Sequence, residues 1–261
     1  MAELDDAYSV GAYIPDADDY YVRWAQAADA FRAELGPRAM LDIAYGDSAR
    51  QVFDLFHPEG VPKGLMIFVH GGFWLKLDKS SWSHLAAGAV ARGWSCAMPS
   101  YDLCPAVGIP DITRQIVRAV TAIAKEAAGP ITLAGHSAGG HLVARTLAPG
   151  MLGPGVAERV ARVVPISPLA DLRPLLLTSM NAQFGLDMDT AEAESPALQP
   201  VPQVPVSVWV GAEERPAFLD QARVLAQAWG AEHVEVAGRH HFDVIEALED
   251  PGSDLVARLT P

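Results

Sequence analysis

Positive charge is scarce in this chain of 261 residues. It has 32 acidic against 19 basic side chains, which gives a formal net charge of −13. Because there is no excess of basic surface to meet phosphate groups, this balance argues against nucleic acid or an anionic membrane as a partner. We interpret the acidic excess as a means of keeping the protein in solution.

Cysteines and long apolar stretches are also scarce. There are two cysteines, Cys96 in an apolar run and Cys104 before a proline, and we do not expect them to form a disulfide. No apolar stretch reaches the ~18 residues that a membrane span needs. The acidic first residues lack the basic start and apolar segment of a secretory signal. These absences predict a cytoplasmic location.

The usual signatures of nucleotide and metal binding are missing. No Gly-x-Gly-x-x-Gly and no phosphate-loop lysine follows the first predicted strands. His136 and His141 are five residues apart around a glycine-rich turn, so they do not form the one-face histidine pair of a helical zinc site. The sequence therefore predicts no cofactor and no metal.

Hydrophobic residues make up 50% of the chain, and their spacing predicts alternating strands and helices. Five residues spaced three and four apart define one face of the first helix: Tyr21, Trp24, Ala28, Phe31 and Leu35. The predicted strands are 41–45, 51–56, 65–69, 94–99, 131–134, 162–166, 206–210 and 233–236. The predicted helices are 17–35, 81–92, 109–123, 141–147, 172–177, 217–229, 242–248 and 254–259.

This alternation predicts an α/β fold with a mostly parallel, doubly wound sheet behind an antiparallel lead-in of two strands. The length suits a single domain over residues 1–261. Within it, residues 1–35 form an N-terminal helical segment that is a candidate lid. Residues 171–204 form an insertion between strands, which we expect to shape a pocket.

The strongest motif is Gly135-His136-Ser137-Ala138-Gly139, between a predicted strand and a predicted helix. A serine in so tight a turn has a strained backbone, and its neighbours two positions away must lack side chains so that the chains can pass. The turn projects the Ser137 hydroxyl above the sheet. It also leaves the Ala138 N–H at a helix start, free to donate to an oxyanion.

A nucleophilic serine needs a base and a carboxylate that orients the base. In this topology the acid follows a late strand and the histidine follows the last one. Glu213-Glu214 and His240-His241 occupy these places. We favour Glu214, at the tip of its turn, over Glu213, and His241, next to the apolar Phe242, over His240.

Glycines after the buried strand 65–69 suggest the rest of an oxyanion hole. In His70-Gly71-Gly72-Phe73, the N–H groups of Gly71 and Gly72, or of Gly72 and Phe73, can point at a carbonyl without an intervening side chain. The next aromatic residues, Phe73 and Trp74, are candidates for stacking on an aryl substrate. For Trp74, packing in the core is an equal alternative.

Several stretches together resemble the kynurenine formamidase (arylformamidase) branch of the α/β-hydrolases, close to the hormone-sensitive-lipase-like esterases. They are HGGFW, DKSSWSHLA, YDLCP, GHSAGGHL, PLADLRPLLLTSMNAQFGLD and GRHHFDVIEAL. The resemblance implies a catalytic Ser137, Glu214 and His241, with Gly71, Gly72 and Ala138 at the oxyanion hole. Two departures stand out: the acid is often Asp in this branch, and Asp102 stands where related esterases commonly have Arg.

The implied activity is hydrolysis through an acyl-enzyme, with an aryl formamide such as N-formylkynurenine as the expected substrate. A carboxylesterase acting on short-chain acyl esters would use the same triad with a different pocket. A non-catalytic binding module on the same fold is the alternative from another class, although it predicts a damaged triad. Both enzymatic alternatives predict a small ester or formamide substrate as the partner. The sequence allows a monomer or a homodimer.

Overall fold

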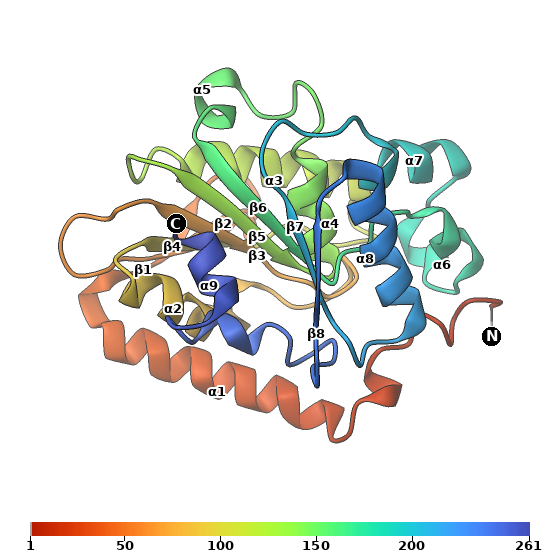
Figure 1. Ribbon diagram of the computed structural model, residues 1–261, viewed down its shortest axis with the longest axis horizontal. Coiled ribbons are helices and arrows are strands. Elements are labelled where there is room, and N and C mark those ends of the chain that lie inside the picture. Colours follow the sequence, from red (N-terminus) through yellow and green to blue (C-terminus); the bar gives the residue numbers. More distant parts are fainter. Residues whose placement is uncertain (1) are drawn as a thin grey trace.

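The computed structural model describes residues 2–261 and arranges them around one sheet of eight strands (Figure 1). Met1, the first residue of the predicted segment 1–35, lies outside the described residues. The strands are β1 (Ala39–Ala44), β2 (Val52–Phe56), β3 (Leu65–Val69), β4 (Ser95–Pro99), β5 (Ile131–His136), β6 (Val160–Ile166), β7 (Ser207–Gly211) and β8 (Glu232–Val236). Their order across the sheet is β1-β2-β4-β3-β5-β6-β7-β8.

The predicted mostly parallel sheet is confirmed. Strand β2 pairs antiparallel with both β1 and β4, and every later pairing is parallel. All residues of β3 and β5 are buried, as expected for continuous apolar runs in strands that are covered on both faces. The carboxyl ends of the parallel strands therefore meet at one edge, where loops from distant parts of the chain converge.

Helices cover both faces of this sheet. Figure 1 shows α1, α2 and α9 on one side and α3 on the other. The bounds are α1 (Ala17–Leu35), α2 (Ala87–Ala91), α3 (Ile109–Ile123), α4 (Ala138–Arg145), α5 (Pro154–Ala157), α6 (Asn181–Phe184), α7 (Met188–Ala193), α8 (Pro216–Trp229) and α9 (Asp254–Leu259). The predicted helices 17–35, 109–123 and 254–259 are confirmed at both ends.

Two predicted helices are confirmed only in part. In 81–92 the helix begins after Trp82, with a 3₁₀ turn at Ser83–Ala86 followed by α2, because the backbone of Trp82 leaves the helical region (φ −122°, ψ 1°) while its ring packs 4.6 Å from that of Trp24. In 242–248 only Glu246–Leu248 forms a 3₁₀ turn. There the carboxylate of Asp243 accepts a hydrogen bond from the N–H of His240 at 2.7 Å, which favours a turn around the histidines.

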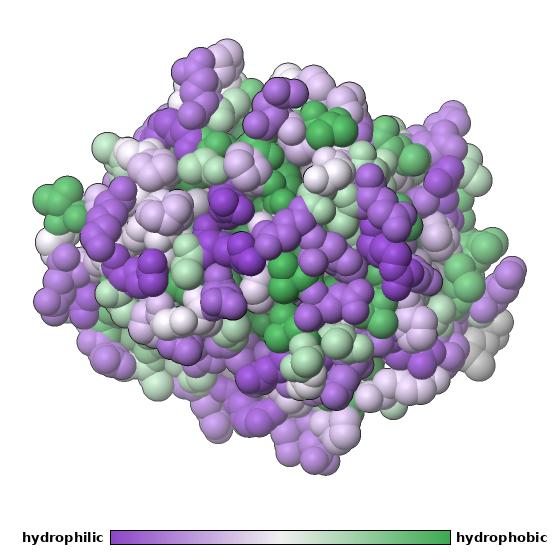
Figure 2. Space-filling view, viewed as in Figure 1, coloured by the Kyte–Doolittle hydropathy of each residue, from purple (hydrophilic) through white to green (hydrophobic). Residues whose placement is uncertain are grey.

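The segment 171–204 contains a 3₁₀ turn at Arg173–Leu177, in place of the predicted helix 172–177, followed by α6 and α7. Both cysteines are buried and free. Among residues 2–261, no helix combines the length and the apolar character needed to cross a membrane. On the face seen in Figure 2, polar residues dominate and apolar residues gather only in small groups.

Candidate active site

Ser137 lies in the sharp turn between β5 and α4, as predicted. Its backbone has φ +56° and ψ −118°, a strained conformation for a residue with a side chain. The flanking glycines are required: a Cβ on Gly135 would lie 2.2 Å from the carbonyl oxygen of Gly139, and one on Gly139 would lie 1.9 Å from that of Val69. The turn therefore closes only with glycine at both places.

Glu214 and His241 form a buried pair at the same edge of the sheet. The Nδ1 of His241 is 2.6 Å from Oε2 of Glu214, and neither side chain is more than 6% exposed. The other carboxylate oxygen accepts hydrogen bonds from the N–H of Gly211, at 3.0 Å, and from the hydroxyl of Ser167. With all these donors the carboxylate is well suited to orient an imidazole.

Glu213 and His240, the sequence neighbours of these two residues, lie in different surroundings. Glu213 is exposed. The Nε2 of His240 lies 3.2 Å from the hydroxyl of Tyr20, and its Nδ1 faces Asp243. The structure thus brings Glu214 and His241 together and leaves Glu213 and His240 outside this pair.

Ser137 and His241 line the same cavity. No hydrogen bond joins them among the described residues, which is common before substrate binds, since catalytic hydrogen bonds often tighten only in the substrate complex. Burial lowers the pKa of His136 well below its usual range, so this histidine is neutral although its ring lies 4.6 Å from that of His241. A proton gained by His241 therefore meets no second positive charge there.

The loop after β3 is the other strained part of the site. Gly72 has φ +110°, and the next two residues, Phe73 and Trp74, have φ +52° and +57°. A Cβ on Gly71 would lie 3.0 Å from Cβ of Ser137, so the loop passes close to the serine. Within residues 2–261, the backbone N–H groups of Ala138 and of the loop residues 71–74 donate to no protein acceptor. These are the free donors that an oxyanion hole requires.

His70, Tyr101 and Arg50 hold this loop from behind, and the sequence did not predict these contacts. The ring of His70 stacks on that of Tyr101 at 4.4 Å, and the hydroxyl of Tyr101 donates to the carbonyl of His70 at 2.9 Å. The guanidinium of Arg50 donates to the carbonyls of Tyr101, at 2.7 Å, and Leu77, at 2.5 Å. Arg50 thus places a cation behind the loop although Asp102 stands where related esterases have arginine. No motif marks Arg50, because it comes from the distant β1–β2 hairpin.

The cavity has a volume of about 210 Å³. Its lining includes six aromatic side chains: Tyr8, Tyr21, Trp24, Phe73, Trp82 and Phe242. Residues 8–11 and α1 belong to the N-terminal segment, and they take the place in the wall that we expected of 171–204, of which no described residue lines the cavity. Phe73 lies in the lining as predicted. Trp74 does not, because it is fully buried against His141 and Phe184, which fits core packing.

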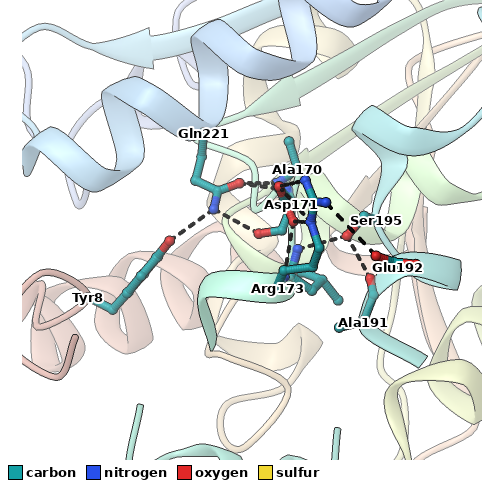
Figure 3. A network of polar contacts seen from close by, with 9 residues as sticks. Tyr8, Ala170, Asp171, Arg173, Ala191, Glu192, Ser195 and Gln221 are labelled. Atoms are coloured by element: carbon teal, nitrogen blue, oxygen red, sulfur yellow. Dashed lines mark hydrogen bonds and ion pairs between the residues drawn. The ribbon is translucent and has the colours of Figure 1, made fainter. Parts of the chain in front are cut away.

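The N-terminal wall is tied to the insertion by a buried glutamine. Figure 3 shows Gln221 of α8 between Tyr8 and the start of the 171–204 segment. Its amide donates to the hydroxyl of Tyr8 at 2.9 Å and to the carbonyl of Asp171 at 2.8 Å, and its oxygen accepts from the N–H groups of Ala170 and Asp171 at 2.7 Å. The start of the insertion and the N-terminal wall therefore share Gln221 as a hydrogen-bond partner.

The described residues contain no group of three or more side chains that could hold a metal ion. The geometry offers instead a strained serine, a buried histidine–carboxylate pair and free backbone donors around one aromatic cavity. These are the parts that acyl transfer needs.

Comparison with known proteins agrees with this geometry. A family model described by the α/β-hydrolase fold matches residues 66–245. The kynurenine formamidase of Drosophila melanogaster is 30% identical over 234 residues, which cover 82% of this chain and 78% of that protein. The chain belongs to the kynurenine formamidase-like branch of the α/β-hydrolases. The resemblance seen in the sequence is confirmed.

Two solved structures are similar to this chain in fold. A candidate thioesterase from Silicibacter sp. is 60% identical, with a TM-score of 0.99 and full coverage of both chains. An esterase from Pyrobaculum calidifontis is 18% identical, covers 94% of this chain and 93% of its own, and has a TM-score of 0.70. At that identity the esterase shows the shared fold alone, whereas the first structure is similar throughout.

Proposed function

We propose that this protein is a serine hydrolase that acts through an acyl-enzyme, with Ser137 as nucleophile, His241 as general base and Glu214 as the acid that orients it. The observation that carries the proposal is the 2.6 Å contact between His241 and Glu214 beside a serine with a positive φ in the same cavity. Their order along the chain, serine, then acid, then histidine, supports the proposal because α/β-hydrolase triads have this order.

The reaction begins when Oγ of Ser137 attacks the substrate carbonyl carbon and His241 accepts the hydroxyl proton. Negative charge develops on the carbonyl oxygen, where the candidate donors are the N–H groups of Gly72 and Ala138 together with that of Gly71 or Phe73. Collapse of the tetrahedral intermediate breaks the bond to the leaving group, which takes the proton from His241. A water molecule then attacks the acylated serine, with His241 again as base, and releases the carboxylic acid.

We propose an aryl formamide, such as N-formylkynurenine, as the substrate. The formyl group is so small that recognition must come from the leaving-group side, where the aromatic lining can pack on a flat ring. The formamidase activity of the relative from Drosophila melanogaster supports this choice. In this reaction the products are the free arylamine and formate.

Short-chain esters or thioesters are the second candidate. The 60% identical protein from Silicibacter sp. is described as a candidate thioesterase. The tetrahedral intermediate at Ser137 could expel an alcohol or a thiol, protonated by His241, in place of an amine. The triad and oxyanion donors would be the same, and only the leaving-group contacts would differ.

A substrate panel tests both proposals. Turnover of N-formylkynurenine and formanilide is compared with that of phenyl acetate, phenyl butyrate and S-phenyl thioacetate, with Ser137→Ala as control. We expect the formamides to be hydrolysed and the variant to lose at least about 10⁴-fold in kcat. Hydrolysis of the esters or the thioester without the formamides would refute the formamidase assignment. A wild-type protein that turns over none of them faster than the variant would refute the enzyme.

A further inference from the structure

The cavity beside Ser137 carries very little charge. Among the described residues that line it, Lys76 is the one lysine, and there is no arginine, aspartate or glutamate. The rest of the lining is aromatic or aliphatic, with glycines, two serines and the hydroxyls of Tyr8 and Tyr21. In a chain with a net charge of −13, a lysine at this place gives the cavity a local positive charge that the surface as a whole lacks.

Lys76 forms a pair of donors with Tyr21. Its Nζ donates a hydrogen bond to the hydroxyl oxygen of Tyr21 at 3.0 Å and lies 5.1 Å from the centre of that ring. Because the tyrosine oxygen accepts this bond, its own hydrogen is available to donate, and the ammonium keeps two further N–H groups. None of the lysine ion pairs among residues 2–261 involves Lys76. Two converging donors, one of them charged, fit a carboxylate.

The pair is fixed relative to the candidate oxyanion hole. The N–H of Lys76 donates to the carbonyl of Gly72 at 3.2 Å, so the lysine belongs to the same tight loop. The ring of Tyr21 packs at 5.4 Å from that of Trp24 and at 5.9 Å from that of Phe242, which follows His241 directly. These aromatic rings and the two donors therefore line the same cavity as Ser137.

We propose that Lys76 and Tyr21 bind a carboxylate carried by the aromatic leaving group, and that Lys76 is a specificity-determining residue. The inference rests on the proposed function, because it takes Ser137 as the point where the acyl group is held. With the carbonyl at the loop after β3, the leaving group extends along the aromatic wall and its anionic substituent meets the donor pair. Neutral aryl substrates leave the ammonium without this partner and are discriminated against.

Matched substrates that differ only in the carboxylate test the assignment. Formanilide is compared with 3-(2-formamidophenyl)propanoate in the wild type, in Lys76→Met and in Tyr21→Phe. The measured quantity is the ratio of the two kcat/KM values, since damage to the triad affects both substrates alike and cancels. Lys125→Met, at an exposed lysine outside the cavity, is the matched control.

We expect the wild type to prefer the anionic substrate by 10-fold or more. Lys76→Met should lower the ratio by about 10- to 100-fold, the usual range for a hydrogen bond to a charged group, and Tyr21→Phe should lower it by a smaller factor. The wild-type ratio should also fall as salt is added, and Lys125→Met should keep the wild-type ratio. A wild-type ratio near one, or a ratio unchanged in Lys76→Met, would overturn the proposal.

A second pair, phenyl acetate and 3-(2-acetoxyphenyl)propanoate, separates this proposal from the formamidase assignment. If the formamides are not hydrolysed, that assignment fails, and the ester pair still measures the ratio. If only the esters are hydrolysed and Lys76→Met lowers the ratio of their kcat/KM values, the result would support the carboxylate site on an esterase. An unchanged ratio on whichever pair is hydrolysed would refute the carboxylate site by itself.

Discussion

Replacing Gly72 by alanine should disable the candidate oxyanion hole while leaving the fold in place. An alanine Cβ at this position would lie 2.2 Å from the carbonyl oxygen of Lys76 and 3.1 Å from its carbon. Both are backbone atoms, so no side-chain rotation can relieve the clash. The backbone of Gly72 also has φ +110°, which a residue with a side chain rarely adopts. The loop must therefore move, and its free N–H groups must move with it.

The size of the effect follows from what the loop supplies. Loss of one oxyanion donor costs about 10²- to 10³-fold in kcat, or roughly 2.7 to 4 kcal/mol of transition-state stabilisation. Relief of the clash by backbone movement should cost about 1–3 kcal/mol of folding free energy, which lowers Tm by about 2–4 °C for each kcal/mol in a chain of this size. Steady-state kinetics and thermal unfolding measure the two quantities separately.

A matched substitution makes the comparison sharp. A Cβ on Gly153 would meet nothing within 4 Å, and this glycine lies at the start of α5, far from the cavity lining. Gly153→Ala should therefore keep wild-type kcat and Tm. If Gly72→Ala keeps wild-type kcat while it remains folded, the loop does not stabilise the transition state and the reasoning is wrong.

Three further predictions concern the candidate triad and the buried histidines. Glu214→Gln should lower kcat by at least about 10³-fold, whereas Glu213→Gln should change it less than threefold, and equal losses would contradict the acid assignment. His241→Ala should be as damaging as loss of the serine, and His240→Ala mild; kinetics showing the reverse ranking would exchange their roles. Burial keeps the pKa of four histidines below the ordinary value of 6.5, namely His70 and His84 (about 4), His141 (about 3) and His136. Between these values and 6.5 the unfolded chain binds more protons, so stability is complete above pH 6.5 and falls as the pH drops toward 4, by up to about 1.4 kcal/mol per pH unit for each histidine. Thermal unfolding from pH 7 to pH 4 checks this, and a constant Tm would contradict it.

The parts of the fold that the sequence predicted well have strong periodic patterns. The run 65–69 is apolar throughout and is a central strand, and the isoleucines of 109–123 line one buried face of α3 together with Val120. The candidate triad was predictable for a different reason. Chain order and strand ends determine where an acid and a histidine must stand, and the structure brings Glu214 and His241 into contact there.

What the sequence did not predict depends on long-range packing. Residues 81–92 have a helical pattern, yet the contact of Trp82 with Trp24 outweighs local propensity. Arg50 lies in a hairpin that is remote from every motif, and only the folded chain shows that it supports the loop after β3. The role of residues 8–11 in the cavity wall likewise depends on the hydrogen bond between Gln221 and Tyr8.

Labelling by a fluorophosphonate tests the central claim most directly, because the reagent reacts with an activated serine as its fluoride leaves. Intact-mass measurement followed by peptide mapping should find one adduct per chain, on Ser137. The adduct should be absent from Ser137→Ala and form much more slowly in His241→Ala. An unlabelled wild-type protein, or an adduct on another residue that persists in Ser137→Ala, would contradict the account.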